Sequence, residues 1–153
     1  MSVQRQKREG CFMPDHDRVI AVAGEGVGKA ENDLKNAAYT LQMGNECPTD
    51  TVCFHAEQCV EKYLKALLVV KGIDFPKTHD VSRIIALLPS RLSVDLTPEE
   101  QGRLTSYATV TRDPGEYEPI SLAEARKAVR IARRVRKGIR TYLPKETLRP
   151  KRK

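Results

Sequence analysis

The segment from residue 51 to residue 71 constrains the fold of this chain most strongly. Its apolar side chains recur at steps of three and four residues, which predicts an amphipathic α-helix. The apolar face comprises Cys53, Ala56, Val60, Tyr63, Leu64, Leu67, Leu68 and Val70. A face this wide is typical of the central helix of a bundle, and Lys71-Gly72 marks the end of the helix.

Four further segments carry the signals of helices. Apolar periodicity and stop residues predict helices over about 26–43 and about 80–88. Two capping boxes, Thr97 with Glu100 and Ser121 with Glu124, open helices over about 97–111 and about 122–142. Because the connections are short, we predict an all-α protein, an antiparallel up-and-down bundle of four to five helices.

The chain divides into three parts in this interpretation. Residues 1–25 show little periodicity and are predicted to be an N-terminal arm, whose order the sequence leaves open. Residues 26–143 form the helical bundle, and residues 144–153 are a basic tail that we expect to be disordered. A length of 153 residues suits a single domain.

Composition narrows the class of protein further. The apolar content of 40% and the charged content of 31% are ordinary for a globular protein. No apolar run approaches the roughly 20 residues of a membrane helix, and the first ten residues lack the apolar core of a secretory signal, so we expect a cytoplasmic protein. The four cysteines form no C-x-x-C pair and fit no usual zinc spacing, so we expect neither a metal nor a cofactor.

A glycine-rich stretch, I-A-V-A-G-E-G-V-G-K-A-E at residues 20–31, suggests a phosphate-binding loop at first sight. A P-loop needs G-x-x-x-x-G-K followed by Ser or Thr, but Ala23 replaces the first glycine and Ala30 replaces the hydroxyl. The dinucleotide-binding pattern G-x-G-x-x-G also fails in both registers. We therefore place Gly26 and Gly28 where the N-terminal arm meets the first helix.

The formal net charge of +7 is distributed unevenly. Residues 1–120 contain 14 Lys and Arg against 18 Asp and Glu, whereas residues 121–153 contain 13 against 2. The last predicted helix holds Arg126, Lys127, Arg130, Arg133, Arg134, Arg136, Lys137 and Arg140. Their mutual repulsion favours an anionic partner, either a nucleic-acid backbone or an acidic protein surface, and the alternative is a solvated helix face.

Three stretches of the sequence resemble the HEPN domain (higher eukaryotes and prokaryotes nucleotide-binding): KAENDLKNAAYTL, FHAEQCVEKYLKALLVVKGIDFPKTHDVSRIIALLP and YATVTRDPGEYEP. The resemblance covers about residues 27–142. It implies an antiparallel helical bundle that usually forms a homodimer. Such domains often accompany a minimal nucleotidyltransferase in toxin–antitoxin or defence pairs, and many are metal-independent RNases.

The family's RNase motif, an Arg followed after four to six residues by a His, is incomplete in this chain. Arg112 and Asp113 resemble the R-x-P variant of the family, but Tyr117 stands where the His is expected. Tyrosine, with a reference pKa of about 10, is a poor general base or acid near neutral pH, although Arg112 could still hold a phosphate. His79 beside Asp80 is the other catalytic candidate, and the alternative is a helix-capping role for this segment.

Polar side chains of the 51–71 helix match further positions of the family. They are Gln58, Glu61, Lys62 and Lys65. Lys62, Lys65 and Lys77 are candidate phosphate ligands beside Arg112. The alternative is a solvated face on which Glu61 pairs with Lys65, four residues later, while His55 lies at the surface or at an interface.

The leading hypothesis is a partner of a minimal nucleotidyltransferase that binds nucleotide or RNA phosphate through Arg112 and nearby basic groups. One alternative is an RNase toxin that uses Arg112 with Tyr117 or His79. The other is a sequence-indifferent nucleic-acid binder that uses the basic last helix.

Overall fold

The computed structural model describes residues 16–109 and 118–149, and all regular structure in these ranges is helical. The α-helices are α2 (His16–Leu41), α3 (Thr49–Val70), α4 (Val81–Ala86), α5 (Pro98–Thr109) and α6 (Leu122–Arg140). Two 3-10 turns, η1 (Gly44–Glu46) and η2 (Lys145–Leu148), follow α2 and α6. The predicted all-α bundle is confirmed.

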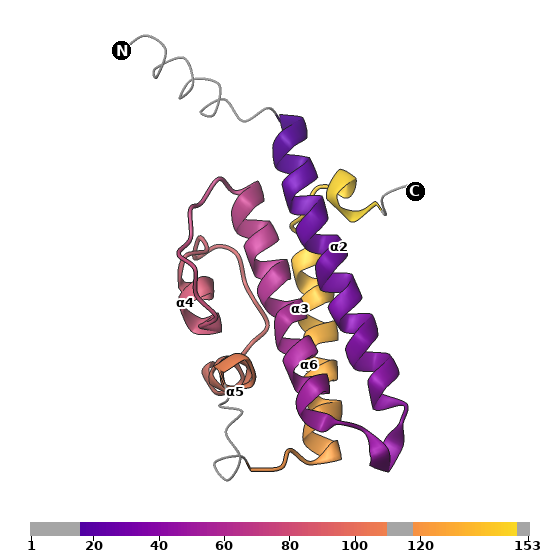
Figure 1. Cartoon of the computed structure of the whole chain (residues 1–153). Helices are drawn as coiled ribbons and strands as arrows, with labels where there is room; N and C mark the ends of the chain where they lie inside the picture. Colours follow the sequence, from indigo (N-terminus) through magenta and orange to yellow (C-terminus); the bar gives the residue numbers. More distant parts are fainter. Residues whose placement is uncertain (1–15, 110–117, 150–153) are drawn as a thin grey trace, which may run out of the picture.

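The three long helices α2, α3 and α6 lie side by side along the molecule (Figure 1). Helix α2 runs antiparallel to both of the others, whereas α3 and α6 run in the same direction. The starts of α3 and α6 are tied together by Thr49, whose Oγ1 donates a hydrogen bond to the Ile120 carbonyl at 2.7 Å. Helices α4 and α5 pack on another side of α3 and return the chain to the end from which α6 starts (Figure 1).

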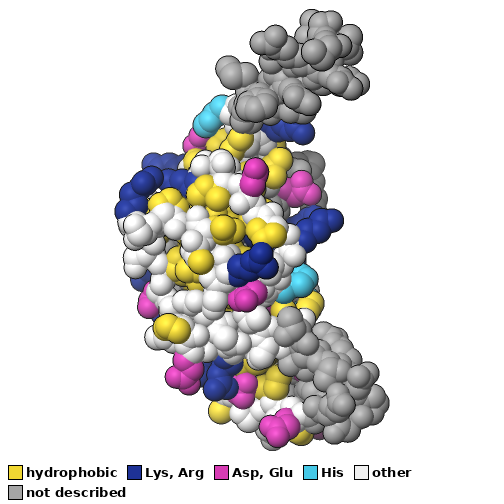
Figure 2. All heavy atoms as spheres, turned by 90° about the vertical axis from the view of Figure 1, so that its left-hand side faces the viewer, with side chains coloured by type: hydrophobic (Ala, Val, Ile, Leu, Met, Phe, Trp, Pro, Cys, Tyr) yellow, Lys and Arg dark blue, Asp and Glu magenta, His cyan; other side chains and the backbone are white. Residues whose placement is uncertain are grey.

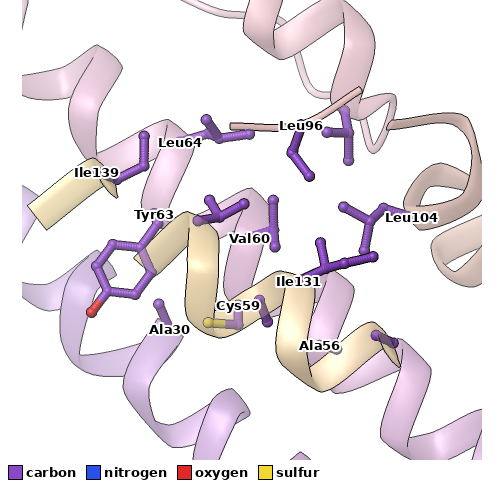
Figure 3. Close-up of a cluster of buried hydrophobic side chains, with 14 of the residues drawn as sticks. Ala30, Ala56, Cys59, Val60, Tyr63, Leu64, Leu96, Leu104, Ile131 and Ile139 are labelled. Carbon is purple, nitrogen blue, oxygen red and sulfur yellow. The ribbon is translucent and has the colours of Figure 1, made fainter. Parts of the chain in front are cut away.

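Helix α3 is the centre of the core, as its wide apolar face predicts. Of the apolar positions predicted for this face, Val70 alone is only partly buried. Ala30 of α2, Leu104 of α5, and Ile131 and Ile139 of α6 pack around the α3 side chains (Figure 3). Burial of each large aliphatic side chain contributes about 1.5–3 kcal/mol, so this cluster supplies much of the driving force for folding.

The first helix begins at His16, ten residues before the predicted start at 26, so the expected junction between arm and helix is wrong. Buried Ala23 and Val27 extend the apolar stripe that Ala30 and Ala37 continue. Gly24 and Gly26 lie inside this helix and give close packing: a Cβ on Gly24 would lie 3.6 Å from the Thr147 carbonyl oxygen, and one on Gly26 would lie 3.6 Å from Ala66 Cβ. Tertiary packing therefore overrides the low helix propensity of glycine here.

The segment after α6 also differs from the prediction. Residues 145–148 form η2, which packs against α2 and buries Thr147, so this part of the expected disordered tail is ordered. A Cβ on Gly24 would be in ordinary van der Waals contact with the Thr147 backbone, so this contact leaves room for a side chain no larger than that of alanine. Residues 150–153 lie outside the described residues.

The predicted helix boundaries elsewhere are supported by their caps. Thr97 and Glu100 make the reciprocal capping box, with hydrogen bonds of 3.0 and 3.1 Å. Ser121 Oγ accepts from the Glu124 backbone at 3.0 Å, but the Glu124 carboxylate bonds Tyr107 instead of closing the box. In the part of the chain that the structure describes, no helix has the length and apolar character needed to cross a membrane.

Candidate functional site

Helix α6 presents one row of basic side chains to solvent. Its inner face is buried through Ala125, Ala128, Ile131, Ala132, Val135 and Ile139. Opposite that face, Arg126, Arg130, Arg133 and Lys137 are all exposed, at helical steps of four, three and four. We call these four residues the α6 ridge. At a rise of about 1.5 Å per residue, the ridge is about 16 Å long.

Two basic side chains beside the ridge, Arg134 and Arg136, are held by the protein itself, whereas Lys127 is exposed and makes no ion pair within the described residues. Arg134, one of the basic residues of the last predicted helix, lies 2.6 Å from Glu100 and 3.3 Å from Asp95. Arg136 makes a bidentate pair with Glu31 of α2 at 2.7 and 2.8 Å. These pairs engage one cation on each flank of α6 and leave the ridge between them.

The flanking pairs are charged at neutral pH. Hydrogen bonding to Arg136 lowers the pKa of Glu31, although partial burial opposes the shift, and a hydrogen bond from Arg134 likewise lowers the pKa of Glu100. The pKa of each arginine is raised in turn by its carboxylate partner. The charges of Arg134 and Arg136 are therefore compensated by carboxylates, whereas those of the ridge and of exposed Lys127 are not paired within the described residues.

No ion pair joins a ridge residue to any carboxylate within 16–109 and 118–149. On the face shown in Figure 2, by contrast, the basic side chains are scattered among acidic and apolar ones. The ridge is therefore a row of like charges that the described protein leaves without compensation. Such a row attracts anions.

A second polar cluster joins α2 to α3. Asp33 is 7% exposed, and its Oδ1 lies 2.7 Å from His55 Nδ1 while its Oδ2 accepts a hydrogen bond from Lys62. Lys62 was predicted to be a candidate phosphate ligand and His55 a surface or interface residue, but both are bound to this buried carboxylate. Asp33 occupies an inward position between Ala30 and Ala37, which is a polar break in an apolar stripe that the sequence already displays.

A third cluster lies where α3 meets the start of α4. Lys65 Nζ donates to Glu61 Oε1 at 2.6 Å, which confirms the predicted pair, and it also lies 5.9 Å from the centre of the Phe75 ring. His79 Nδ1 lies 3.1 Å from both oxygens of Glu61, which is itself 4% exposed. His79 and Lys65 thus converge on one carboxylate, while Lys77 is exposed away from described partners.

Glu57, one turn before Glu61, is fully buried and was not singled out from the sequence. Its Oε1 accepts from Gln58 Nε2 at 2.7 Å, and its Oε2 has no hydrogen-bond partner among the described residues. Burial, together with neighbouring Glu61, raises the pKa of Glu57. Burial also acts on Glu61, but neighbouring Glu57 and the hydrogen bonds with Lys65 and His79 lower its pKa. Glu57 is therefore the protonated member of the pair at neutral pH.

Three predicted site residues, Arg112, Asp113 and Tyr117, lie outside the described residues. The remaining candidates fall into two groups that the structure does not bring together. Lys62, Lys65 and His79 are engaged with carboxylates of α2 and α3, whereas the ridge of α6 is exposed. The ridge is the described surface best suited to an anionic ligand.

Comparison with known proteins defines the class. A model of the HEPN domain matches residues 25–142, so the chain belongs to the HEPN domain family. The crystal structure of TT1696 from Thermus thermophilus is similar, with a TM-score of 0.65 and 24% identity over 79% of this chain and 98% of that one. This likeness supports the shared fold. No curated protein matches the sequence.

Proposed function

We propose that this HEPN-domain protein binds the phosphates of RNA or nucleotides through the α6 ridge. One observation carries the proposal: the ridge cations are exposed and unpaired within the described residues, while Arg134 and Arg136, on opposite flanks of the same helix, are bound to carboxylates. Family membership is consistent with this role.

The physical basis is the release of counterions. Each phosphate contacted by Lys or Arg releases condensed cations, so the logarithm of the binding constant falls by about 0.7–0.9 per contact for each tenfold increase in salt. Four contacts from the ridge give a slope of roughly −3 to −4. Contacts to phosphates carry no sequence information directly, so we expect little sequence preference.

Binding of fluorescently labelled RNA, measured by anisotropy, tests this proposal. The variant Arg130→Gln/Lys137→Gln removes two ridge cations, and Lys35→Gln/Arg91→Gln removes one Arg and one Lys that are exposed elsewhere. The proposal expects the ridge variant to bind about tenfold more weakly and the control to bind like the parent. Equal loss in both variants would mean that net charge, rather than the ridge, governs binding.

A partnership with a minimal nucleotidyltransferase is the second proposal, and it rests on the resemblance to HEPN proteins of such pairs. An acidic surface of that enzyme could use the same ridge, because charge complementarity does not distinguish a carboxylate row from a phosphate row. Co-expression with a nucleotidyltransferase encoded beside this gene, followed by co-purification of the parent and the ridge variant, tests it. A complex that forms with the parent but not with the ridge variant supports this use of the ridge.

RNase activity through Arg112 with Tyr117 or His79 is a third proposal, which the family resemblance carries. Incubation of the parent and of Arg112→Ala with total RNA tests it directly. Cleavage by the parent that the variant loses supports an RNase, whereas RNA that both leave intact counts against it. If the parent cleaves RNA, His79→Ala tests whether His79, which is already bonded to Glu61, is the partner of Arg112. Cleavage that survives this substitution leaves Tyr117 as the partner.

A further inference from the structure

We infer that the α6 ridge takes a nucleic-acid duplex, along the phosphates of one strand, in preference to a single strand or a free nucleotide. The inference rests on the proposed phosphate binding and narrows its ligand class. Three features of α6 carry it: the rigidity of the ridge, its narrow width and its lack of aromatic side chains.

The rigidity of the ridge is that of its backbone, because the helix beneath it is fixed on three sides. Its inner face is buried in the core, with Ala132 at 0% and Val135 at 1% exposure. Arg136 ties one flank to α2, and Arg134 ties the other flank to Glu100 of α5. A row of cations attached at fixed spacing complements a fixed row of phosphates, whereas a flexible single strand must lose conformational entropy to match it.

The ridge is also narrow. With about 100° of rotation per residue, Arg126, Arg130, Arg133 and Lys137 fall within an arc of about 60°. A helix lying inside a groove faces a phosphate row on each side and benefits from cations on both flanks. On the flanks of α6, Arg136 and Arg134 are instead committed to Glu31 and Glu100, and exposed Lys127 near the start of the helix is the exception. The arrangement therefore fits one strand's row of phosphates along the outside of a duplex.

The ridge carries no aromatic side chain on which a base could stack. Proteins that bind single strands without sequence preference obtain about 1–3 kcal/mol per base from stacking. Tyr142, just beyond the ridge, has its hydroxyl within 3.3 Å of the Ser93 backbone nitrogen and within 3.4 Å of the Ser93 carbonyl oxygen. A free nucleotide fits poorly as well, because the cations are spread over about 16 Å on a convex surface rather than gathered in a pocket.

Four probes under identical salt conditions test this inference on the full chain: an RNA duplex and a DNA duplex of about 20 base pairs, an unstructured RNA strand of the same length, and ATP. The duplexes exceed the ridge in length, at about 3.4 Å per pair along each strand. We expect both duplexes to bind at least about fivefold more tightly than the single strand, and ATP to compete weakly. We also expect the ridge variant Arg130→Gln/Lys137→Gln to lose this preference and the control Lys35→Gln/Arg91→Gln to keep it.

The possible failures are distinguishable. Single-strand binding as tight as duplex binding, with both weakened by the ridge variant, overturns the duplex inference and leaves the proposed phosphate binding intact. Binding to none of the probes overturns both. Duplex binding that the ridge variant does not alter also overturns both, because the ligand then uses another surface. Far-ultraviolet circular dichroism of each variant confirms that the helical fold is retained.

Discussion

Arg136 of α6 and Glu31 of α2 form a bidentate ion pair, with nitrogen–oxygen distances of 2.7 and 2.8 Å. The same carboxylate accepts a hydrogen bond from Tyr63 of α3 at 2.5 Å, and Arg140 donates to the Tyr63 hydroxyl at 3.1 Å. One carboxylate thereby joins the three long helices of the bundle. The pair also fixes the rotation of α6, and with it the direction in which the ridge faces.

Arg136→Met is expected to destabilise the fold by about 1–2 kcal/mol at neutral pH. The estimate is modest because the Arg136 and Glu31 side chains are 34% and 28% exposed, so solvent screens the pair. Since the pKa of Glu31 is lowered in the folded state, the pair's contribution is present above the unfolded pKa and is lost as the pH falls through the folded pKa. Urea denaturation at about pH 7 and about pH 3 measures the loss. Lys137→Met, on the adjacent exposed position, should cost less than about 0.5 kcal/mol.

Glu57→Gln is expected to stabilise the protein, and to do so more strongly as the pH rises. The folded state holds the Glu57 proton to a higher pH than the unfolded state, whose carboxyl has the ordinary pKa of about 4.3. The free energy of unfolding of the parent therefore falls with increasing pH above that value, by at most about 1.4 kcal/mol per pH unit. Glutamine cannot ionise and lacks this dependence. Urea denaturation of both proteins at about pH 5 and about pH 8 tests the prediction, and an equal difference at the two pH values contradicts it.

Gly28→Ala is expected to stabilise the protein by about 0.5–1 kcal/mol, because alanine favours the helix and a Cβ at this position meets nothing within 4 Å. Gly72 provides the contrast, because it has a φ of +69° at the end of α3. Gly72→Ala should destabilise the fold by about 1 kcal/mol. Thermal denaturation measures both effects, as a higher melting temperature for Gly28→Ala and a lower one for Gly72→Ala. A lower melting temperature for Gly28→Ala than for the parent would contradict the assignment of Gly28 to the open side of α2.

Asp33→Ala is expected to cost about 2–3 kcal/mol, because it leaves both His55 and Lys62 without their shared carboxylate at a partly buried site. Asp33→Asn should cost less, since the amide oxygen can still accept one hydrogen bond. Chemical denaturation compares the two variants. Equal effects of both would show that the charge of Asp33, rather than its hydrogen bonding, holds α2 to α3.

The sequence predicted those features that depend on local pattern. The wide apolar face of α3, the Thr97–Glu100 capping box and the Glu61–Lys65 pair all lie within a few turns of one helix, and all are confirmed. The start of α2 was missed because glycines weaken a helix locally, while the packing of Gly24 on Thr147 depends on residues more than 120 positions apart.

The candidate site was predicted only in part, because some of its interactions join residues that lie far apart in the sequence. Helical spacing already places Arg126, Arg130, Arg133 and Lys137 on one face. The sequence does not reveal that Arg134 and Arg136 are used by Glu100 and Glu31, because those partners come from other helices. A buried carboxylate such as Asp33 leaves a weak signal, a polar residue within an apolar stripe, which periodicity alone attributes to the solvent side.

The salt dependence of nucleic-acid binding tests the central claim most directly. The measurement is the slope of the logarithm of the binding constant against the logarithm of salt concentration, for the parent, for Arg130→Gln/Lys137→Gln and for Lys35→Gln/Arg91→Gln. If the ridge contacts phosphates, loss of two ridge cations should reduce the magnitude of the slope by about 1.5, and the control should keep the parent's slope. Identical slopes for the parent and the ridge variant would contradict the claim that the α6 ridge is the phosphate-binding surface.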